Sequence, residues 1–595
     1  ENQEQSTKKY RALINLKGDV NIIDGLDYHI SLSGDYNILH EYGYFPANSI
    51  EGETSKGEAS DYRGFSFTQL TEHTLTYKHG WGNLKFNVLA GYSYQKTKID
   101  NAYVKGINFL SPSLKYLVSA GEINGGSSSV EEYALQSLFS RFNFNYADKY
   151  LLELSIRSDA SSKFSKSHRV GYFPAASAGW RISDEKWFPR ACRAFSDLKL
   201  RASVGLTGNQ EGIGSYAYQS VYDASADYDN TPGLSLPNEK PNPDLTWEKT
   251  LQYGAGLDVS LLCHRIDVSF DWYKKDTRDL LLTHSINSVS GYSSQTSNVG
   301  SITNTGIDLS LTSHNLTKAF MWDTQVNLSW VKNKVASLAN DNKDIETGYC
   351  NILRVGEPMA SFYLIKEEGI YQSKEEILAQ KNGQALWDSG IRPGDVKYFD
   401  KNDDGAINDD DRTVCGSPFP KVYGSVSNTL RYAGFDLLID LQYSLGNKLY
   451  AGWKAGDHGL GNLGGDSNGY NVLKQEWDNR WTESNPSHDT PRAVASGTAF
   501  ENNTLDYTTR YLENANFLRI RNITLGYTLP KSLTQKVGIS RLRVYATGSN
   551  LYTFTSYDGF DPEVCVFPNN ATYRGYDMGS VPRLRSFVFG LNIQF

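Results

Sequence analysis

Apolar and polar residues alternate with a period of two along much of the chain, which is the pattern of a β-strand with one apolar face. The alternation is clearest in the last segment, Phe587–Phe595, and recurs in residues 152–156, 266–272 and 322–330, where charged or amide side chains occupy the second face. Both a membrane barrel and a β-sandwich have such strands, so the alternation by itself does not distinguish them.

The same pattern predicts seventeen strands. We expect them near residues 8–18, 26–38, 66–79, 84–98, 131–146, 149–158, 171–182, 198–206, 247–262, 265–275, 300–314, 320–332, 420–432, 435–446, 516–530, 541–552 and 584–595.

The connections between these strands are mostly short and long in turn. Tight connections are expected at His79–Asn83, Ala147–Asp148, Cys263–His264, Asn315–Ala319 and Ala433–Gly434, and long ones at 207–246, 333–419 and 447–515. Short turns at one end of the strands and long loops at the other are typical of outer-membrane barrels, whose short turns are periplasmic. A β-sandwich does not require its short and long connections to lie at opposite ends of the strands. The loop lengths therefore favour an all-β, transmembrane antiparallel barrel.

The strand count also predicts that this barrel is incomplete. Successive strands of an antiparallel barrel run in opposite directions. If the last of seventeen strands ends in the periplasm, the first strand also runs towards the periplasm, and residues 1–7 lie outside the cell. Seventeen is an odd number, whereas bacterial single-chain barrels have an even number of strands. We therefore expect at least one more strand before Glu1.

Composition narrows the function classes. The formal charge is -8 and charged residues make up 21 %, so no basic face for nucleic acid is indicated. The chain has 39 Tyr, and a Tyr-rich composition suits the aromatic girdles of a barrel. It suits a soluble, secreted glycan-binding β-protein equally well. No stretch approaches the roughly 18–20 apolar residues of a membrane-spanning helix.

Catalytic and disulfide motifs are missing from the sequence. There is no HExxH, GxSxG or Walker sequence, and adjacent acids such as Glu367–Glu368 face different ways, so we predict that the chain is not an enzyme. The five cysteines show no CxxC spacing, and an odd number cannot all pair internally, so they are interpreted as incidental thiols.

Eleven segments in register carry a resemblance to a known family. They are IRSDASSKFSKSHRVGYFPAASAGWRIS from Ile156, LKLRASVGLTGNQEGIGSY from Leu198, NPDLTWEKTLQYGAGLDVSLL from Asn242, WYKKDTRDLLL from Trp272, NVGSITNTGIDLSL from Asn298, GEPMASFYLIKEEGIYQSKEE from Gly356, GDVKYFDKNDDGAINDDDR from Gly394, NRWTESNPSHDTPRA from Asn479, FLRIRNITLGYTLP from Phe517, SNLYTFTSYDGFDPEV from Ser549 and the closing SVPRLRSFVFGLNIQF. Together they resemble the SusC/RagA branch of the TonB-dependent outer-membrane transporters.

The resemblance implies a barrel of about 22 strands, with the N-terminal plug and the TonB-binding region outside this chain. Residues 1–332 would form barrel strands, 333–419 a long extracellular loop, and 420–595 the last strands with the extracellular loop 447–515. The implied function is TonB-dependent import of glycans or peptides across the outer membrane. The implied partners are a SusD-like surface lipoprotein lid, the chain's own plug, TonB and outer-membrane lipid.

Several alternatives stay open. A siderophore or vitamin receptor of the same superfamily would have no lid, and a non-transporting barrel or adhesin would have no plug. A secreted β-rich enzyme would be soluble without detergent. The sequence does not decide whether the substrate is a glycan or a peptide. It also does not decide whether the complex is one transporter–lid unit or a dimer of such units.

Residues 400–411 match the calcium-loop pattern D-x-[DN]-x-[DN]-G with an acid at position 12. Oxygen ligands would come from Asp400, Asn402, Asp404, the Ala406 carbonyl and Asp411. The aspartate at position 12 is shorter than the usual glutamate. The alternative is an acidic turn without a metal.

Two further features concern the long loops. Ser373 and Glu376 have capping-box spacing and predict a short helix. Aromatic residues that could stack on sugars or hold peptides, and could equally form interface belts or contact a partner, are Tyr216, Tyr218, Trp453, Tyr470, Trp477 and Trp481.

Overall fold

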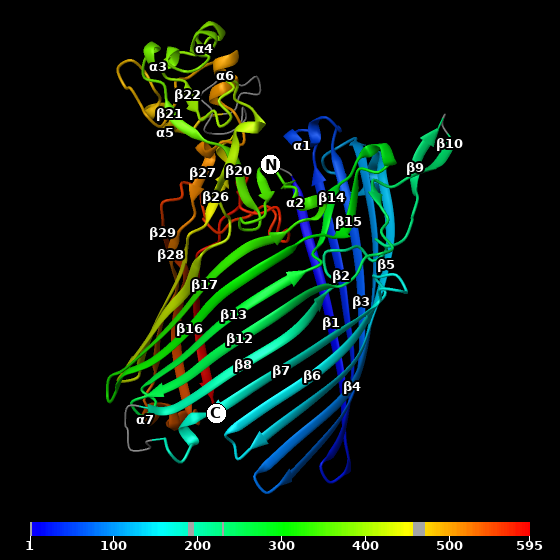
Figure 1. Ribbon diagram of the computed structural model, residues 1–595, viewed down its shortest axis with the longest axis vertical. Helices are drawn as coiled ribbons and strands as arrows, with labels where there is room; N and C mark the ends of the chain where they lie inside the picture. Colours follow the sequence, from blue (N-terminus) through cyan, green and yellow to red (C-terminus); the bar gives the residue numbers. More distant parts are fainter. Residues whose placement is uncertain (1–2, 189–194, 229–230, 456–470) are drawn as a thin grey trace. The chain divides into compact units, whose positions relative to one another are not determined.

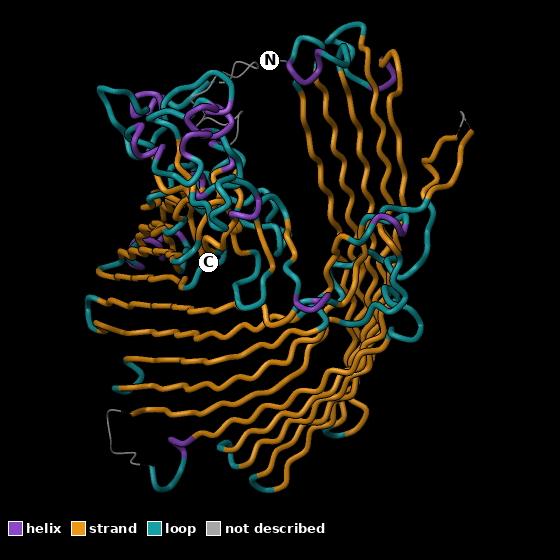
Figure 2. Tube along the Cα trace, turned by 45° about the horizontal axis from the view of Figure 1, so that its top comes forward, coloured by secondary structure: helices purple, strands orange, loops and turns teal. Residues whose placement is uncertain are grey.

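The computed structural model describes residues 3–188, 195–228, 231–455 and 471–595. Strands make up most of the trace, and the helices are short (Figures 1 and 2). Seventeen strands belong to one sheet, and each corresponds to one of the seventeen predicted segments, so this prediction is confirmed. They are β1 (Glu4–Ile23), β2 (Leu26–Phe45), β3 (Glu58–Trp81), β4 (Leu84–Phe109), β5 (Ala120–Tyr146), β6 (Tyr150–Ser161), β7 (Val170–Arg181), β8 (Phe195–Asn209), β12 (Glu248–Leu261), β13 (Ile266–Arg278), β16 (Ser301–Thr317), β17 (Met321–Ser337), β24 (Val422–Tyr432), β25 (Phe435–Leu445), β28 (Phe517–Thr528), β29 (Arg541–Thr555) and β31 (Ser586–Gln594).

The remaining elements lie in the connections. The short strands are β9 (Asp223–Tyr228), β10 (Thr231–Ser235), β11 (Glu239–Lys240), β14 (Leu281–Ser285), β15 (Ser294–Asn298), β18 (Ile345–Thr347), β19 (Asn351–Leu353), β20 (Ser361–Ile365), β21 (Glu367–Ile370), β22 (Val396–Tyr398), β23 (Arg412–Gly416), β26 (Lys448–Ala451), β27 (Leu512–Asn514) and β30 (Tyr576–Asp577). The α-helices are α1 (Ile50–Glu53), α2 (Ala339–Asn342), α3 (Lys374–Leu378), α4 (Gly383–Ser389), α5 (Lys474–Asn479), α6 (Thr498–Asn503) and α7 (Lys531–Thr534). No described helix has the length and apolar character needed to span a membrane.

The chain divides into two units. Unit 1 comprises Glu1–Glu185, Arg201–Tyr253 and Thr277–Val299, and unit 2 comprises Lys186–Leu200, Gly254–Asp276 and Gly300–Phe595. In unit 1, β1 to β7 form an antiparallel meander in which each strand pairs with the next. Strands β4 and β5 have 26 and 27 residues, far more than the about 9–11 that cross a bilayer. The sequence predicted shorter strands because residues 99–109 and 120–130 lack clear alternation; the backbone ladder continues there without it.

In unit 2, β16, β17, β24, β25, β28, β29 and β31 form a second antiparallel meander. Its register places residues of one kind side by side. An apolar row crosses the first four strands, and a polar row lies one residue away on the opposite face. The apolar row is Leu311, Val326, Val426 and Leu441, and the polar row is Thr312, Gln325, Ser427 and Asp440.

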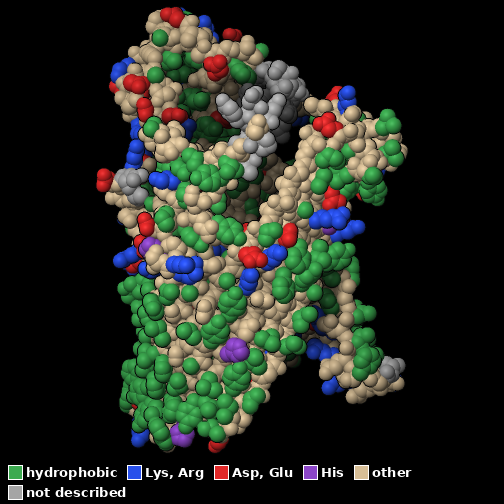
Figure 3. All heavy atoms as spheres, turned by 90° about the vertical axis from the view of Figure 1, so that its right-hand side faces the viewer, with side chains coloured by type: hydrophobic (Ala, Val, Ile, Leu, Met, Phe, Trp, Pro, Cys, Tyr) green, Lys and Arg blue, Asp and Glu red, His purple; other side chains and the backbone are tan. Residues whose placement is uncertain are grey.

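We call these two sides of the sheet the apolar face and the polar face. On the polar face, the Ser427 hydroxyl donates to Asp440 Oδ1 at 2.6 Å. Large side chains on the apolar faces of other strands, such as Trp81, Phe142 and Phe589, are exposed. Hydrophobic side chains gather over the lower part of the face seen in Figure 3, with most acidic and basic side chains above them. A hydrophobic surface of this extent requires an apolar environment outside the sheet.

The tight connection between β24 and β25 is a two-residue hairpin turn. Ala433 has φ 49° and Gly434 has φ 88°, which are the left-handed values that both central residues of a type I′ turn need. A side chain at Gly434 would also lie 2.8 Å from the Thr528 carbonyl oxygen. The turn fixes the register of the two strands that carry part of the pocket described below.

Cysteine pairing is absent from the described residues: Cys263, Cys350, Cys415 and Cys565 are free, and Cys192 lies outside them. Burial raises the pKa of the Cys350 thiol to about 12, so this thiol stays protonated and unreactive at neutral pH.

Candidate functional site

The two longest connections of unit 2 fold together into one body. We call the described parts of these connections, residues 338–421, 446–455 and 471–516, the folded loop pair. One cluster packs Ile365 and Val396 from the first segment against Trp481 and Leu505 from the second. A further cluster joins Phe362 to Tyr450 and Tyr511. The loops predicted from the sequence are therefore an ordered structure with its own hydrophobic core.

Asp395 connects the two segments of the folded loop pair. Its carboxylate is fully buried and accepts two hydrogen bonds from Arg492, at 2.7 and 2.9 Å. Asn503 Nδ2 and the Arg392 backbone N–H donate to the same carboxylate at 2.9 and 2.8 Å. Each carboxylate oxygen thus has two donors, which is what a buried charge requires.

Glu367 and Arg510 form a second ion pair between the segments, with Arg510 Nη1 3.2 Å from Glu367 Oε1. Arg510 also donates to the Asp489 carbonyl at 3.0 Å. Burial raises the pKa of Glu367 above its ordinary value of 4.5, although Arg510 opposes the shift. The protonated form of Glu367 is therefore favoured more in the folded than in the unfolded state.

This shift has a defined effect on stability. A raised pKa contributes stability that is fully present below the ordinary value of 4.5 and is lost as the pH rises through the folded value. Glutamine at position 367 cannot titrate. We expect the melting temperature of wild-type protein, relative to Glu367→Gln, to rise as the pH falls from 8 towards 4.5, by fluorescence-monitored thermal unfolding. Glu375→Gln is the control, because Glu375 is exposed and its pKa is lowered by hydrogen bonds at the start of α3. The melting temperature of wild-type protein relative to this variant should therefore change little, and should fall as the pH falls. A pH-independent difference for Glu367→Gln would contradict the prediction.

The predicted helix near Ser373 is present as α3. The Ser373 hydroxyl accepts from the Glu376 N–H at 3.2 Å, as expected for a helix N-cap. The Glu376 carboxylate instead accepts from the N–H of Gln372, one residue before the cap, at 2.8 Å.

The acidic loop 400–411 closes on its own backbone. The Asp400 carboxylate accepts from the N–H groups of Asp404 and Gly405 at 3.2 and 2.7 Å. Asp411 is fully buried and accepts from the N–H groups of Lys401 and Asn408, both at 2.8 Å. These bonds shape the turn that calcium loops use, and its oxygen donors suit Ca²⁺ chemically.

Within the described ranges, no group of three or more His, Cys, Asp or Glu side chains is arranged to hold a metal ion. Asn402 and Asp404 bind each other, with Asn402 Nδ2 2.9 Å from Asp404 Oδ2, and the Asp404 carboxylate accepts from the Ala406 N–H at 2.7 Å. Calcium at this loop therefore stays a prediction.

The aromatic candidates lie in different units. In unit 1, Tyr216 is 41 % exposed and its hydroxyl accepts from the Glu132 N–H at 3.1 Å; the Tyr218 hydroxyl accepts from Gln219 at 2.6 Å. In unit 2, Trp477 is 47 % exposed and Arg480 stacks 3.8 Å from its ring centroid.

The other tryptophans in the second segment have structural partners. Trp453 Nε1 donates to the Tyr557 hydroxyl at 3.1 Å, and Trp481 Nε1 donates to Gln372 Oε1 at 3.2 Å. Tyr470 lies outside the described residues. Among the described candidates, Tyr216 and Trp477 are the most exposed.

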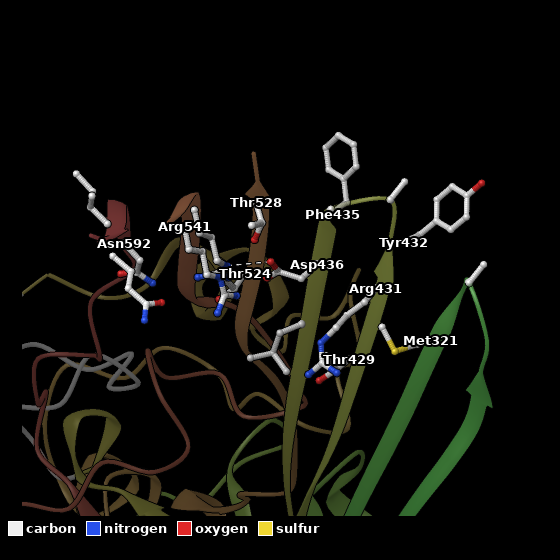
Figure 4. A pocket seen from close by; sticks show the side chains of 17 residues that line it. Met321, Thr429, Arg431, Tyr432, Phe435, Asp436, Thr524, Thr528, Arg541 and Asn592 are labelled. Carbon is white, nitrogen blue, oxygen red and sulfur yellow. Dashed lines mark hydrogen bonds and ion pairs between the residues drawn. The ribbon is translucent and has the colours of Figure 1, made fainter. Parts of the chain in front are cut away.

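A pocket of about 660 Å³ lies on the polar face of unit 2, at the end of the strands where the turns are short. Arg431, Arg541, Arg543 and Asp436 line it together with threonine and amide side chains. Figure 4 shows Arg431, Asp436 and Arg541 on this polar side, with Phe435 turned away at the hairpin. Three arginines against one aspartate give the lining an excess of positive charge.

Two of these arginines are held by carboxylates. Arg543 reaches over Gly526 to form a bidentate pair with Asp436, with its Nε 2.9 Å from Asp436 Oδ1. A Cβ at position 526 would lie 2.5 Å from Arg543 and 2.6 Å from Asp436, so the glycine makes this pair possible. Arg431 lies 3.3 Å from Asp323.

The comparisons with known proteins define the class of this chain. Residues 2–349 match the family of the TonB dependent receptor-like β-barrel. Because this match covers more than half of the chain, the protein belongs to that family. Barrels of this family are outer-membrane proteins, and the fold described above is the large antiparallel sheet expected of one.

Particular relatives place the chain more closely. TonB-dependent receptor P3 of Formosa agariphila is 32 % identical over 616 residues, which cover all of this chain and 58 % of that protein. The receptor SusC of Bacteroides thetaiotaomicron is 32 % identical over 78 % of this chain and 44 % of its own length. A structure of the RagAB peptide transporter matches all of this chain with a TM-score of 0.83 and 25 % identity, over 62 % of that chain. The resemblance to SusC and RagA is thus confirmed, and the chain spans about half of each relative.

The pocket arginines and the buried ion pairs were not predicted from the sequence. Strand alternation already placed Arg431, Asp436 and Arg543 on the polar face, and charges on that face were the available signal. The ion pairs of Asp395 and Glu367 left no such signal, because their partners lie 97 and 143 residues away along the chain.

Proposed function

We propose that this chain forms most of the barrel of a TonB-dependent importer of oligomeric nutrients, either glycans or peptides. The observation that carries the proposal is the similarity of the whole chain to RagAB, a peptide transporter, and of most of it to SusC. Import itself, and any absence of enzymatic activity, are properties of the whole protein, of which this chain spans about half.

A SusD-like surface lipoprotein is the proposed partner above the long loops. The folded loop pair supports this, because an ordered body with its own core offers a fixed surface on which a lid can seat. A lidless siderophore or vitamin receptor is the second candidate. In the lidded importer the substrate would lie between lid and barrel, and Tyr216, Tyr218 and Trp477 are the described rings that we propose as contacts.

The test is gentle detergent extraction of the native outer membrane, followed by intact-mass and peptide analysis of what migrates with this chain. A lipoprotein present in equal amount, together with a plug segment, is the expected result. A receptor recovered with its plug but without a lipoprotein would favour the second candidate. Recovery of this chain in the soluble fraction, folded and alone, would refute both.

The bilayer position of the sheet can be tested with two neighbouring residues of β16. Leu311 belongs to the apolar row and Thr312 to the polar row. Leu311→Arg should destabilise the barrel by about 2–4 kcal/mol if it lies near the bilayer midplane. Thr312→Arg should change the stability little, because its side chain meets a polar surface. Urea unfolding in lipid vesicles measures both; equal effects would reject the assignment of the faces.

We further propose that the loop 400–411 binds one Ca²⁺, which stiffens the folded loop pair and takes no part in chemistry. The ligands would be the side chains of Asp400, Asn402 and Asp404 and the Ala406 carbonyl, with Asp411 as the acid at position 12. A carboxylate set of this kind holds Ca²⁺ through oxygen atoms alone.

Calcium removal tests this proposal. EDTA should increase amide hydrogen exchange in residues 400–411, and added Ca²⁺ should reverse the increase. Asp400→Ala should abolish the response, whereas Asp403→Ala should retain it, because Asp403 is exposed and lies between ligand positions, paired with Lys381 at 3.0 Å. Exchange that is the same with and without Ca²⁺ would leave the loop as an acidic turn.

A further inference from the structure

The apolar face of β1 and β2 in unit 1 changes from apolar to basic at one level along the strands. On this face of β1, every second residue from 10 to 20 is apolar, aromatic or glycine, and Lys8 comes next. On β2 the same holds from 28 to 38, and His40 comes next. Both stretches have the length of about 9–11 residues that crosses a bilayer. Lys8 and His40 therefore lie where the hydrocarbon layer ends, on the side away from the short turn that joins the two strands.

Arg63 of β3 continues this level onto a third strand. Lys8 lies opposite His40 in the register of β1 and β2, and His40 lies opposite Arg63 in the register of β2 and β3. We call Lys8, His40 and Arg63 the outer basic row. Neighbouring strands are about 4.8 Å apart, so the backbones at Lys8 and Arg63 are about 10 Å apart. Two long basic side chains at that separation can reach one anion between them.

One carboxylate orients the outer basic row without neutralising it. Asp61 lies 3.1 Å from His40 Nε2 and accepts a hydrogen bond from Arg63 Nε at 3.0 Å. The Arg63 side chain is nevertheless 71 % exposed. Lys8 is exposed too, and its side chain forms neither a hydrogen bond nor an ion pair with any part of the chain that the structure describes. Lys8 and Arg63 thus provide two positive charges against the single charge of Asp61.

Aromatic rings lie next to the outer basic row, on its side towards the short turns. Tyr10 of β1 is 62 % exposed. Tyr36 of β2 packs against Phe65 and Phe67 of β3, with ring centroids 4.7 and 6.4 Å apart. Such rings are typical of the boundary between bilayer and water. Along the strands the surface therefore presents cations, then rings, then aliphatic side chains, which is the order that a lipid with an anionic headgroup requires.

We propose that the outer basic row binds the phosphate group of a phosphorylated glycolipid of the outer leaflet, whose acyl chains lie along the apolar face of β1 and β2. The proposal rests on the proposed function, which places this end of the strands outside the cell. Guanidinium and ammonium groups both pair with phosphate oxygens. A lipid is selected over a soluble anion because the row continues directly into the lipid-facing surface, and a free phosphate would leave the rings beside it uncovered.

The bound lipid would fix the depth of β1 to β3 in the membrane. Moving the outer basic row inward would place Lys8 and Arg63 in hydrocarbon, which is costly for charged side chains. Moving it outward would break the contact with phosphate and expose the aromatic rings to water. The row therefore acts as a stop in both directions, whereas an apolar face alone resists only outward movement.

Native mass spectrometry of the full-length receptor tests the binding. The receptor is reconstituted in phosphatidylcholine nanodiscs that contain lipid A, a phosphorylated glycolipid, or the same lipid A after chemical removal of its phosphates. We expect lipid A to stay bound when the nanodisc is removed in the spectrometer, and the dephosphorylated form to be lost. Inorganic phosphate, added to nanodiscs of phosphatidylcholine alone, should give no bound species.

Charge variants then locate the site. Lys8→Gln and Arg63→Gln should each lower the retention of lipid A by about fivefold, the effect expected of one basic residue at an anionic lipid surface, and Lys8→Arg should preserve it. Lys9→Gln is the matched control, because Lys9 is the next residue of β1 and faces the polar side; it should leave the retention unchanged. The folded barrel is checked by its heat-dependent migration in electrophoresis. If Arg63→Gln does not fold, Lys8→Gln carries the test, because Lys8 has no partner to lose within the described residues.

Three results would overturn the proposal: equal retention of lipid A with and without its phosphates, equal retention by the Lys8→Gln and Lys9→Gln variants, or binding of inorganic phosphate alone. The measurement is independent of transport. A receptor that retains lipid A through the outer basic row but imports no oligomer would refute the proposed import and support the lipid site. A receptor that imports oligomers but retains no lipid A would refute the lipid site alone.

Discussion

Replacing Asp395 with alanine is expected to separate the two segments of the folded loop pair, at a cost of about 3–5 kcal/mol in the stability of that region. The substitution removes the buried carboxylate and leaves Arg492 and Asn503 with unpaired donors in the interior. Asp395→Asn keeps the shape but removes the charge, so its effect should have the same sign. Hydrogen exchange of residues 490–505 measures the opening directly.

The matched control is Asp388→Ala, in the same segment. Asp388 is exposed and accepts one hydrogen bond from Gln384, at 2.8 Å, so its removal should cost no more than about 1 kcal/mol. If Asp395→Ala and Asp388→Ala raise the exchange of residues 490–505 equally, the carboxylate does not hold the segments together.

Replacing Arg519 with alanine should have an effect of similar size at another place in unit 2. Its guanidinium is 1 % exposed and donates to Thr553 at 2.9 Å, to Asp561 at 2.6 Å and to Glu563. Without it, Asp561 loses its ion-pair partner and Glu563 keeps only Arg583, 3.6 Å away, which should cost about 3–5 kcal/mol. The loss is measured by urea unfolding and by protease cleavage within residues 556–585.

A neighbouring arginine of β28 provides the comparison. Arg521 is 57 % exposed in its side chain and lies 4.0 Å from Asp440, so Arg521→Ala should cost at most about 1 kcal/mol. Arg519→Lys tests the geometry as well as the charge, because an ammonium group cannot reproduce a planar three-way fork. Full stability of Arg519→Lys would show that charge alone is sufficient.

The sequence predicted the sheet well because strand alternation is a local signal. Leu311 and Thr312 are adjacent, and because one is apolar and the other polar, the sequence already indicates that they face opposite sides of a sheet. The strand ends were predicted less well. In β5 the run INGGSSSV shows no alternation of apolar and polar residues. It is a strand because it pairs with β4, and a local sequence pattern does not reveal that pairing.

The folded loop pair could not be predicted for a related reason. Its core joins residues such as Phe362 and Tyr511, and its ion pairs join Asp395 to Arg492 and Glu367 to Arg510. Each contact depends on two segments that are separated in sequence by a complete hairpin. By contrast helix α3, whose N-cap hydrogen bond joins Ser373 and Glu376 three residues apart, was predicted correctly.

The separation of the partners in the folded loop pair also determines when this body can form. Between its two segments lie β24 and β25, so residues 338–421 cannot complete their core before that hairpin and the following loop have been synthesised and placed. Closing such long loops is entropically costly and slow. A chain halted after β24 would therefore expose an unprotected loop to proteases, and resistance of residues 338–421 to cleavage serves as a signal that barrel assembly has passed that hairpin.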